Sequence, residues 1–306
     1  MNTLTMLMAL MLGLLTVPGG KNSSLAKENG YVINLDRAEK LEKMTYSSLF
    51  SKAGIIVLED TDESLLGKVD KLEVCDNNLY VLEKGRGLFL FNKQGKFIKM
   101  IGRKGKGPGE YIDPDDISID RENKKIYVLD SQTQNVLKYS SNGTFESSFK
   151  LENKGTRSTF IQPFKNALYT NLYTFDESGK RFLLSKVDVT NGKRISFQFE
   201  ASQYNKGWNE LFSTNQHTFI SGPTGNPKFM QIFMDTIFEI TPKGIKPYIT
   251  LQSKKLVTKE YLETLIAEND MSKSTRVSKI CDRLMKTDKI YLSLIHISEP
   301  TRPEPI

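Results

Sequence analysis

A run of closely spaced glycines is the first group of residues in this sequence that could do chemistry. Gly102, Gly105, Gly107 and Gly109 follow one another closely, and glycine-rich loops can bind phosphates through their backbone N–H groups. The spacing fits neither of the two common phosphate-binding patterns, and no amphipathic helix follows that could present its N-terminus to a phosphate. We therefore interpret the run as a tight connection between two sheet units and expect no nucleotide or other cofactor there.

Charged residues alternate with these glycines and form the second group. Arg103, Lys104 and Lys106 precede Glu110 and Tyr111. A loop with this composition could contact a polyanion or an acidic glycan, because loops on a rigid scaffold commonly carry binding functions. A solvated loop without a ligand is the alternative, and the residues leave both open. These five residues are called the candidate binding loop below.

An acidic cluster follows the loop and could bind Ca²⁺. Asp113, Asp115, Asp116 and Asp120 lie close together, but the glycine and the closing glutamate of an EF-hand are missing. We interpret these side chains as turn formers and strand-edge charges and assign no metal ligand.

Residues for covalent catalysis are scarce. His217 is the one credible base for a nucleophile, and no G-x-S-x-G pattern occurs. The two cysteines, Cys75 and Cys281, are too few for a disulfide framework, and each is interpreted as a small buried residue. We therefore assign no catalytic residue.

The bulk composition favours a soluble β protein. The chain has 306 residues, a net charge of +7 and 10% aromatic residues, with 17 Phe and 12 Tyr. The basic residues are spread along the chain and no helix carries a basic stripe, so we interpret the charge as a lysine-rich solvated surface and do not expect nucleic acid as a partner.

Short alternating apolar runs separated by turn residues predict β-strands over most of the chain. The runs lie at 31–36, 54–60, 79–84, 88–91, 96–102, 116–120, 125–130 and 136–140. A helix is predicted only near 257–269, where Val257, Tyr261, Leu262, Leu265 and Ile266 share one side and Thr258 is the expected N-cap.

The strongest feature is a repeat. Residues 72–98 and 117–145 share the order strand, turn, Tyr-Val-Leu-acid, turn, apolar strand and closing glycine, and looser copies lie at 167–199 and 228–251. The closing residues are Gly95, Gly143, Gly192 and Gly244, at intervals of 48, 49 and 52. Glycine suits such turns because it adopts positive φ at little cost.

The repeat predicts an all-β fold, a β-propeller of four-stranded antiparallel blades. One such unit has two unpaired edges and cannot bury both faces, and packing several units around an axis solves both problems. A β-sandwich with accidentally similar hairpins is the alternative. Glu83 and Asp130 recur at equivalent positions, which indicates a structural hydrogen-bonding role.

Four segments carry a resemblance to known propeller families. Residues 101–130 resemble the NHL-type propeller repeat, and the segments 58–74, 95–111 and 234–251 resemble the six-bladed β-propeller proteins of Bacteroidetes. The resemblance implies an exported, often lipid-anchored propeller. The chain departs from it because it lacks an anchoring cysteine and has room for about four blades of the six.

Both ends are expected to lie outside the propeller. Residues 1–20 resemble a signal peptide with the apolar run 6–17, although no basic residue precedes that run. Residues 293–306 turn proline-rich and resemble a sequencing-adapter read-through, so we expect a non-native or disordered tail, with the propeller at 31–292 and a natural sequence that continues differently after Leu292.

These features favour an exported binding or scaffold protein of the cell envelope, in the periplasm or at the surface, whose ligand is a carbohydrate or a protein. Membrane attachment is expected only through the N-terminal segment. The alternative is a propeller hydrolase or lyase acting on polysaccharide or peptide, with His217 and acids of the inner strands at its site.

Overall fold

The fold was analysed in a computed structural model, which describes residues 30–38, 45, 54–152, 157–172, 179–208, 218–222, 225–267 and 287. These residues form two compact units. The first holds the described residues between Ala38 and Lys150 together with Gly222 and Gly225, and the second holds the others. The expected signal peptide and tail, as well as His217 and Cys281, lie outside the described residues.

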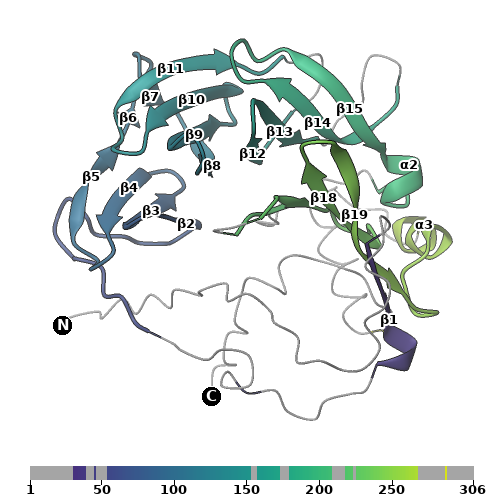
Figure 1. Ribbon diagram of the computed structural model, residues 1–306. Helices are drawn as coiled ribbons and strands as arrows, with labels where there is room; N and C mark the ends of the chain where they lie inside the picture. The colour runs from purple at the N-terminus through teal and green to yellow at the C-terminus, as the bar shows by residue number, and fades with distance from the viewer. Residues whose placement is uncertain are drawn as a thin grey trace. The chain divides into compact units, whose positions relative to one another are not determined.

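The first unit contains two four-stranded antiparallel sheets in which neighbouring strands are consecutive in sequence (Figure 1). Blade 1 consists of β2 (Lys71–Cys75), β3 (Asn78–Glu83), β4 (Gly87–Asn92) and β5 (Phe97–Ile101). Blade 2 consists of β8 (Pro114–Asp120), β9 (Lys125–Asp130), β10 (Asn135–Ser140) and β11 (Phe145–Lys150). The connection between the blades carries a short parallel pair, β6 (Arg103–Lys104) and β7 (Glu110–Tyr111).

The second unit contains two further sheets and the helices. Blade 3 consists of β12 (Ile161–Phe164), β13 (Ala167–Asn171), β14 (Phe182–Asp188) and β15 (Arg194–Glu200). Blade 4 consists of β16 (Phe219–Ile220), β17 (Lys228–Phe229), β18 (Thr236–Thr241) and β19 (Gly244–Gln252). β1 (Tyr31–Asn34) adds a fifth, parallel strand beside β19 (Figure 1). The helices are the 3-10 turn η1 (Leu35–Arg37), α2 (Ala201–Tyr204) and α3 (Lys259–Ala267).

The expected fold class, a propeller built from four-stranded antiparallel blades, is confirmed. All four closing glycines of the repeat have positive φ, from 75° to 138°, and each lies at the turn between the third and fourth strands of its blade. A register shift also interrupts the pairing of those two strands in every blade. The repeat seen in sequence is therefore a repeat of local backbone geometry.

The two central strands of blade 1, β3 and β4, are apolar on both faces because both faces are covered. Along β3, Tyr80 and Leu82 pack into the core shared with blade 2, while Leu79 and Val81 pack into a second cluster on the other side. Successive side chains of a strand point to opposite faces, so double coverage demands a continuous apolar run. Cys75 is a buried free thiol in the shared core, as the sequence predicted.

One predicted strand is absent. Residues 54–60 pair with no strand, although the alternation was read correctly: Ile56 and Leu58 pack against blade 1, while Ile55 and Val57 are exposed. Glu59 makes the contacts that a ladder would make, through its backbone N–H to Gly95 and its carboxylate to the N–H of Phe97. An alternating apolar pattern predicts an extended segment with one buried face. Whether that segment also pairs with a strand depends on its neighbours in the fold.

The predicted helix is confirmed and a shorter one was missed. α3 buries Leu262 and Leu265, and the Oγ1 of Thr258 accepts the N–H of Tyr261 at 3.2 Å, as expected of an N-cap. α2 is a single turn, too short to show a helical period. It is held by the backbone bond from Ala201 N–H to the carbonyl of Arg181.

Candidate functional site

The connection between blades 1 and 2 is a rigid loop, held by Glu110. One carboxylate oxygen of Glu110 accepts from Nε of Arg103 at 2.6 Å, and the other accepts from the backbone N–H of Gly107 at 2.8 Å. These two contacts lower the pKa of Glu110, the backbone bond being the larger cause. A further bond from Gly105 N–H to the carbonyl of Tyr111 closes the loop, and Lys106 lies within it, exposed.

Asp130, at the end of β9, ties this loop to blade 2. Its Oδ2 accepts the N–H of Ile112 at 2.7 Å, and its Oδ1 accepts the N–H of Thr133 at 3.1 Å. The hydroxyl of Thr133 in turn accepts the N–H of Asn135 at 3.3 Å, where β10 begins. One buried carboxylate thus fixes the exit of the loop relative to the strand that faces it.

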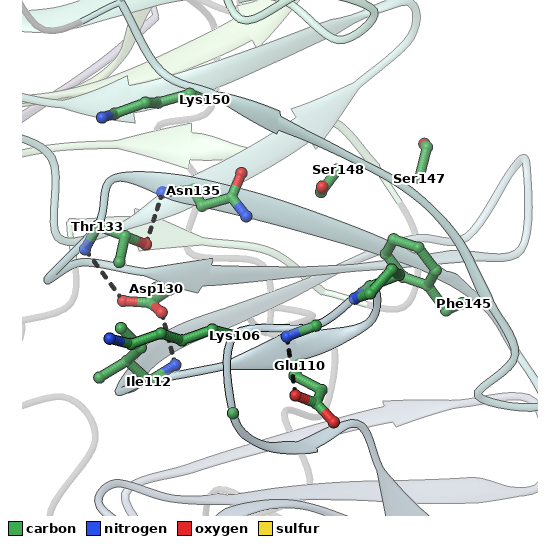
Figure 2. A pocket seen from close by; sticks show the side chains of 13 residues that line it. Lys106, Glu110, Ile112, Asp130, Thr133, Asn135, Phe145, Ser147, Ser148 and Lys150 are labelled. Carbon is green, nitrogen blue, oxygen red and sulfur yellow. Dashed lines mark hydrogen bonds between the residues drawn. The ribbon is translucent and has the colours of Figure 1, made fainter.

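A pocket of about 690 Å³ lies between the loop and the outer strands of blade 2 (Figure 2). Its lining residues are Gly105, Lys106, Gly107, Pro108, Glu110, Ile112, Asp130, Thr133, Asn135, Phe145, Ser147, Ser148 and Lys150. All belong to the first unit. Strand pairing brings Lys150 opposite Asn135 and Ser148 opposite Leu137, so the β10–β11 ladder forms the upper wall in this view.

Phe145 forms the boundary between this pocket and the core. Its ring packs edge-on against Tyr139 with centroids 5.8 Å apart, and a Cβ on Gly109 would lie only 2.9 Å from its Cβ and Cγ. The glycine is needed at position 109 both for this approach and for its φ of +73°. This confirms that the glycine run serves a tight connection between sheet units.

The polar groups of the pocket divide into two sets. Glu110 and Asp130 are already occupied by the donors described above. Within the described part of the chain, by contrast, no hydrogen bond or ion pair engages the ammonium groups of Lys106 and Lys150 or the side-chain amide of Asn135. The same holds for the hydroxyl of Ser148, so these four side chains are available to a ligand. Ser147 lies opposite Lys138, so its side chain points to the other face of β11.

The structure separates the five residues of the candidate binding loop. Lys106 and Glu110 line the pocket. Arg103 and Lys104 are exposed on β6 and do not line it. Tyr111 lies in the core at 1% exposure, where its hydroxyl donates to the carbonyl of Ile101 at 2.9 Å, so it cannot contact a ligand in the pocket.

Sequence reasoning missed the second wall of the pocket. Asn135, Phe145, Ser148 and Lys150 lie in and beside ordinary strand patterns, and only the register of β10 with β11 brings them to the loop. A usable signal was present in the run Phe-Glu-Ser-Ser-Phe-Lys, because Ser148 occupies the strand position that Met100 has in blade 1.

The acidic residues at 113–120 do not act as one cluster. Asp115, Asp116 and Asp120 each contact a different partner. Asp116 is fully buried and pairs with Nζ of Lys71 at 2.7 Å. Asp115 lies 3.4 Å from Nζ of Lys84, and Asp120 accepts the N–H and the side-chain amide of Asn123 at the β8–β9 turn. Asp120 has the predicted role of a turn former, whereas Asp116 instead forms a buried ion pair between β8 and β2.

A further buried carboxyl of the first unit, that of Glu73, has a shifted pKa. Burial raises its pKa, and the nearby cations Lys71 and Arg121 oppose that shift. Nη2 of Arg121 contacts its Oε2 at 3.1 Å. Glu73 lies on β2, the first strand of blade 1, and lines neither of the two pockets described for this chain.

The predicted structural role of Glu83 and Asp130 is confirmed, and it extends to a third blade. Glu83 accepts the N–H of Gly67 at 3.3 Å, as Asp130 accepts that of Ile112. In blade 3, Asn171 does the same for the N–H of Phe160 at 2.7 Å. In each case the last residue of the second strand binds the segment that leads into the blade.

No helix in the described ranges is long and apolar enough to cross a membrane. A family model described as a domain of unknown function, DUF4934, matches residues 30–300. No curated protein matches the sequence significantly.

A solved structure of low sequence identity shares the fold. An inferred exported protein from Bacteroides fragilis superposes with a TM-score of 0.57 at 21% identity, over 76% of this chain and 63% of that protein. The present chain therefore spans less than two thirds of that protein's length. A member of the DUF4221 family from Bacteroides vulgatus gives a TM-score of 0.41 at 12% identity, over 65% of this chain and 64% of that one.

Proposed function

Because the chain belongs to the DUF4934 family, for which no activity is described, we propose from the pocket itself that the protein is a binding protein of the cell envelope. Its ligand site is the pocket between the loop at 105–112 and the β10–β11 ladder. The observation that carries this proposal is the set of four unengaged polar side chains around one cavity, those of Lys106, Asn135, Ser148 and Lys150. A pocket lined by a few convergent polar groups is the usual form of a small-ligand site.

The rigidity of the walls supports binding further. The contacts of Glu110 and Asp130 hold both walls before a ligand arrives. Ordering a loop on binding costs affinity, and a loop that is already ordered avoids this cost. The ligand is a carbohydrate or a protein segment of the envelope.

Export is the second part of the proposal. The apolar run at 6–17 followed by Pro18 favours a signal peptide, and the related fold from Bacteroides fragilis belongs to an inferred exported protein. The count of six blades and the NHL-like character of the repeats also belong to the proposal. Fractionation of the native cells checks export, since accumulation in the cytoplasm would contradict it.

A pocket-filling variant tests the binding site. Ser148→Trp places a large ring on the exposed wall of the pocket, while Lys93→Trp places the same ring on an exposed turn of blade 1 that lines neither described pocket. Both proteins are titrated calorimetrically with neutral oligosaccharides, acidic oligosaccharides and peptides. A ligand of the wild type should bind Lys93→Trp equally and Ser148→Trp at least about tenfold more weakly. Equal binding by Ser148→Trp, or no ligand for the wild type, contradicts the proposal.

The alternative function, a hydrolase or lyase, has weaker support. A buried carboxyl with a raised pKa is a common feature of catalytic sites, and Glu73 has one, but Lys71 and Arg121 already contact it. Turnover of polysaccharide or peptide substrates that is lost in Glu73→Gln would favour this alternative. Turnover that persists in Glu73→Gln would show that Glu73 is not a catalytic residue of such an enzyme.

A further inference from the structure

The charges around the pocket indicate which class of ligand it takes. Four ionisable side chains line it, two acidic and two basic. Glu110 is neutralised by Arg103 and by the N–H of Gly107, and Asp130 is 2% exposed with an N–H at each oxygen. Lys106 and Lys150 are exposed and have no acidic partner among the described residues. The charge that a ligand meets is therefore positive.

The two ammonium groups come from opposite walls. Lys106 belongs to the loop and Lys150 to the end of β11, and Figure 2 shows their side chains on either side of Thr133 and Asp130, extending towards the same end of the view. A cation from each wall suits a ligand with more than one negative group along its length, because each lysine can contact a different group.

The remaining wall is made of hydrogen-bonding groups and one ring. Asn135 provides an amide with both donors and an acceptor, and Ser148 provides a hydroxyl that can act as either. Phe145 presents the edge of an apolar surface beside them (Figure 2). Hydroxyls and amides that can both donate and accept match the hydroxyls of a sugar, and an aromatic ring matches the C–H face of a pyranose.

We propose that the pocket binds an acidic oligosaccharide, with carboxylates of successive uronic-acid residues on Lys106 and Lys150 and sugar hydroxyls on Asn135 and Ser148. This inference rests on the proposed function and specifies its ligand. An oligosaccharide is favoured over an acidic peptide because the neutral polar groups of the pocket, Asn135 and Ser148, can each donate and accept, as binding of sugar hydroxyls requires.

Calorimetry with one matched pair of probes tests the charge requirement. The probes are tetragalacturonate and its full methyl ester, which has the same sugar ring but no carboxylate charge. The wild type should bind the free acid at least about tenfold more tightly than the ester. Lys106→Gln and Lys150→Gln should each weaken binding of the acid by roughly 5- to 10-fold. Added salt should reduce the difference between acid and ester.

The control variants carry the same charge change outside the pocket. Lys104→Gln removes a lysine from the same loop, and Lys93→Gln removes one from blade 1; both residues are exposed. Neither should change the affinity for tetragalacturonate by more than about twofold. Losses equal to those of Lys106→Gln would show that the net charge of +7 alone attracts the acid, and would overturn the inference.

Other outcomes separate this inference from the proposed function. If acid and ester bind equally and Ser148→Trp weakens both, the pocket is a sugar site and its preference for acid is refuted. If an oligoglutamate peptide binds as tightly as tetragalacturonate and depends equally on Lys106, the ligand is an anion of another class and the saccharide is refuted. If another ligand requires the pocket and neither galacturonate probe binds, the inference falls and the proposed function stands.

Discussion

Alanine substitution at three glycines of the first unit should lower its stability to different extents. Gly85, Gly143 and Gly95 have nearly the same backbone conformation, with φ of +80°, +80° and +85°. Their surroundings differ. A Cβ added at Gly85 would meet nothing within 4 Å, one at Gly143 would lie 2.7 Å from Cγ1 of Ile101, and one at Gly95 would lie 1.9 Å from the carbonyl oxygen of Val57.

Replacement of each glycine by alanine therefore lowers the free energy of unfolding by two contributions. One is common to all three sites and the other depends on the surroundings of each. The left-handed conformation costs an L-residue about 1–2 kcal/mol, and the reduced freedom of the unfolded chain returns about 0.4–1 kcal/mol. Gly85→Ala should thus lose about 1 kcal/mol. Gly143→Ala should lose a further 1–3 kcal/mol or so, because Ile101 is fully buried and cannot easily give way. Gly95→Ala should lose the most, because a backbone carbonyl must move.

The assay must report on the first unit alone. The single tryptophan, Trp208, lies in the second unit, so its fluorescence does not follow blades 1 and 2. Hydrogen exchange at increasing urea concentration, read on peptides from β3, β4, β9 and β10, gives the free energy of unfolding of these sheets. For Gly95→Ala it should also show faster exchange at Glu59, whose N–H binds the carbonyl of Gly95. Equal losses at all three positions, within about 0.5 kcal/mol, would refute the steric part of the reasoning.

Two further predictions concern buried phenols of the first unit. Tyr111→Phe should cost about 1–3 kcal/mol because it leaves a buried backbone donor and acceptor without the hydroxyl that bridges them, while Tyr204→Phe, at an exposed ring, should cost under about 0.5 kcal/mol in the second unit. Burial raises the pKa of Tyr127 to about 12, so the folded protein keeps a proton that the unfolded chain releases near pH 10, and stability falls between pH 10 and 12. Tyr127→Phe should reduce that fall by roughly 1–2 kcal/mol in urea titrations, and an unchanged slope would contradict the assignment.

The sequence was informative wherever one residue type satisfies one local requirement. Gly95 and Gly143 were recognisable because their turns need positive φ, and Glu83 and Asp130 because an acid recurs at the same strand end. The same requirement in blade 3 is met by Asn171. An amide accepts an N–H as a carboxylate does, so a search for acids could not find it.

Features that depend on pairing between distant strands could not be predicted. Residues 54–60 show the alternation of a strand, yet among the described residues they form no ladder with another strand and are linked to blade 1 by single hydrogen bonds such as that from Glu59 to Gly95. Lys106 and Lys150 share a pocket only because of the register of β10 with β11. Tyr111 was grouped with its charged neighbours, but in β7 its side chain points to the face opposite that of Glu110, into the core.

The parallel pairing of β1 with β19 affects the order in which the second unit can fold. The two strands are joined by further contacts such as the bond from the N–H of Lys254 to Asp36, which closes a loop of 218 positions. Closing such a loop costs on the order of 5 kcal/mol of chain entropy, compared with far less for a two-residue hairpin. The hairpins of blade 4 can therefore form early, and the fifth strand joins them late.

Because β19 is synthesised long after β1, the apolar strand β1 stays unpaired during synthesis. At about 5–20 residues per second, β1 waits on the order of 10–40 s before β19 has been made. In that interval the apolar residues Tyr31, Val32 and Ile33 have no partner strand, and all three stay more than 40% exposed even after pairing. An unpaired strand of this composition favours association with other chains, so the first residues of the fold need protection for longer than any other part of blade 4.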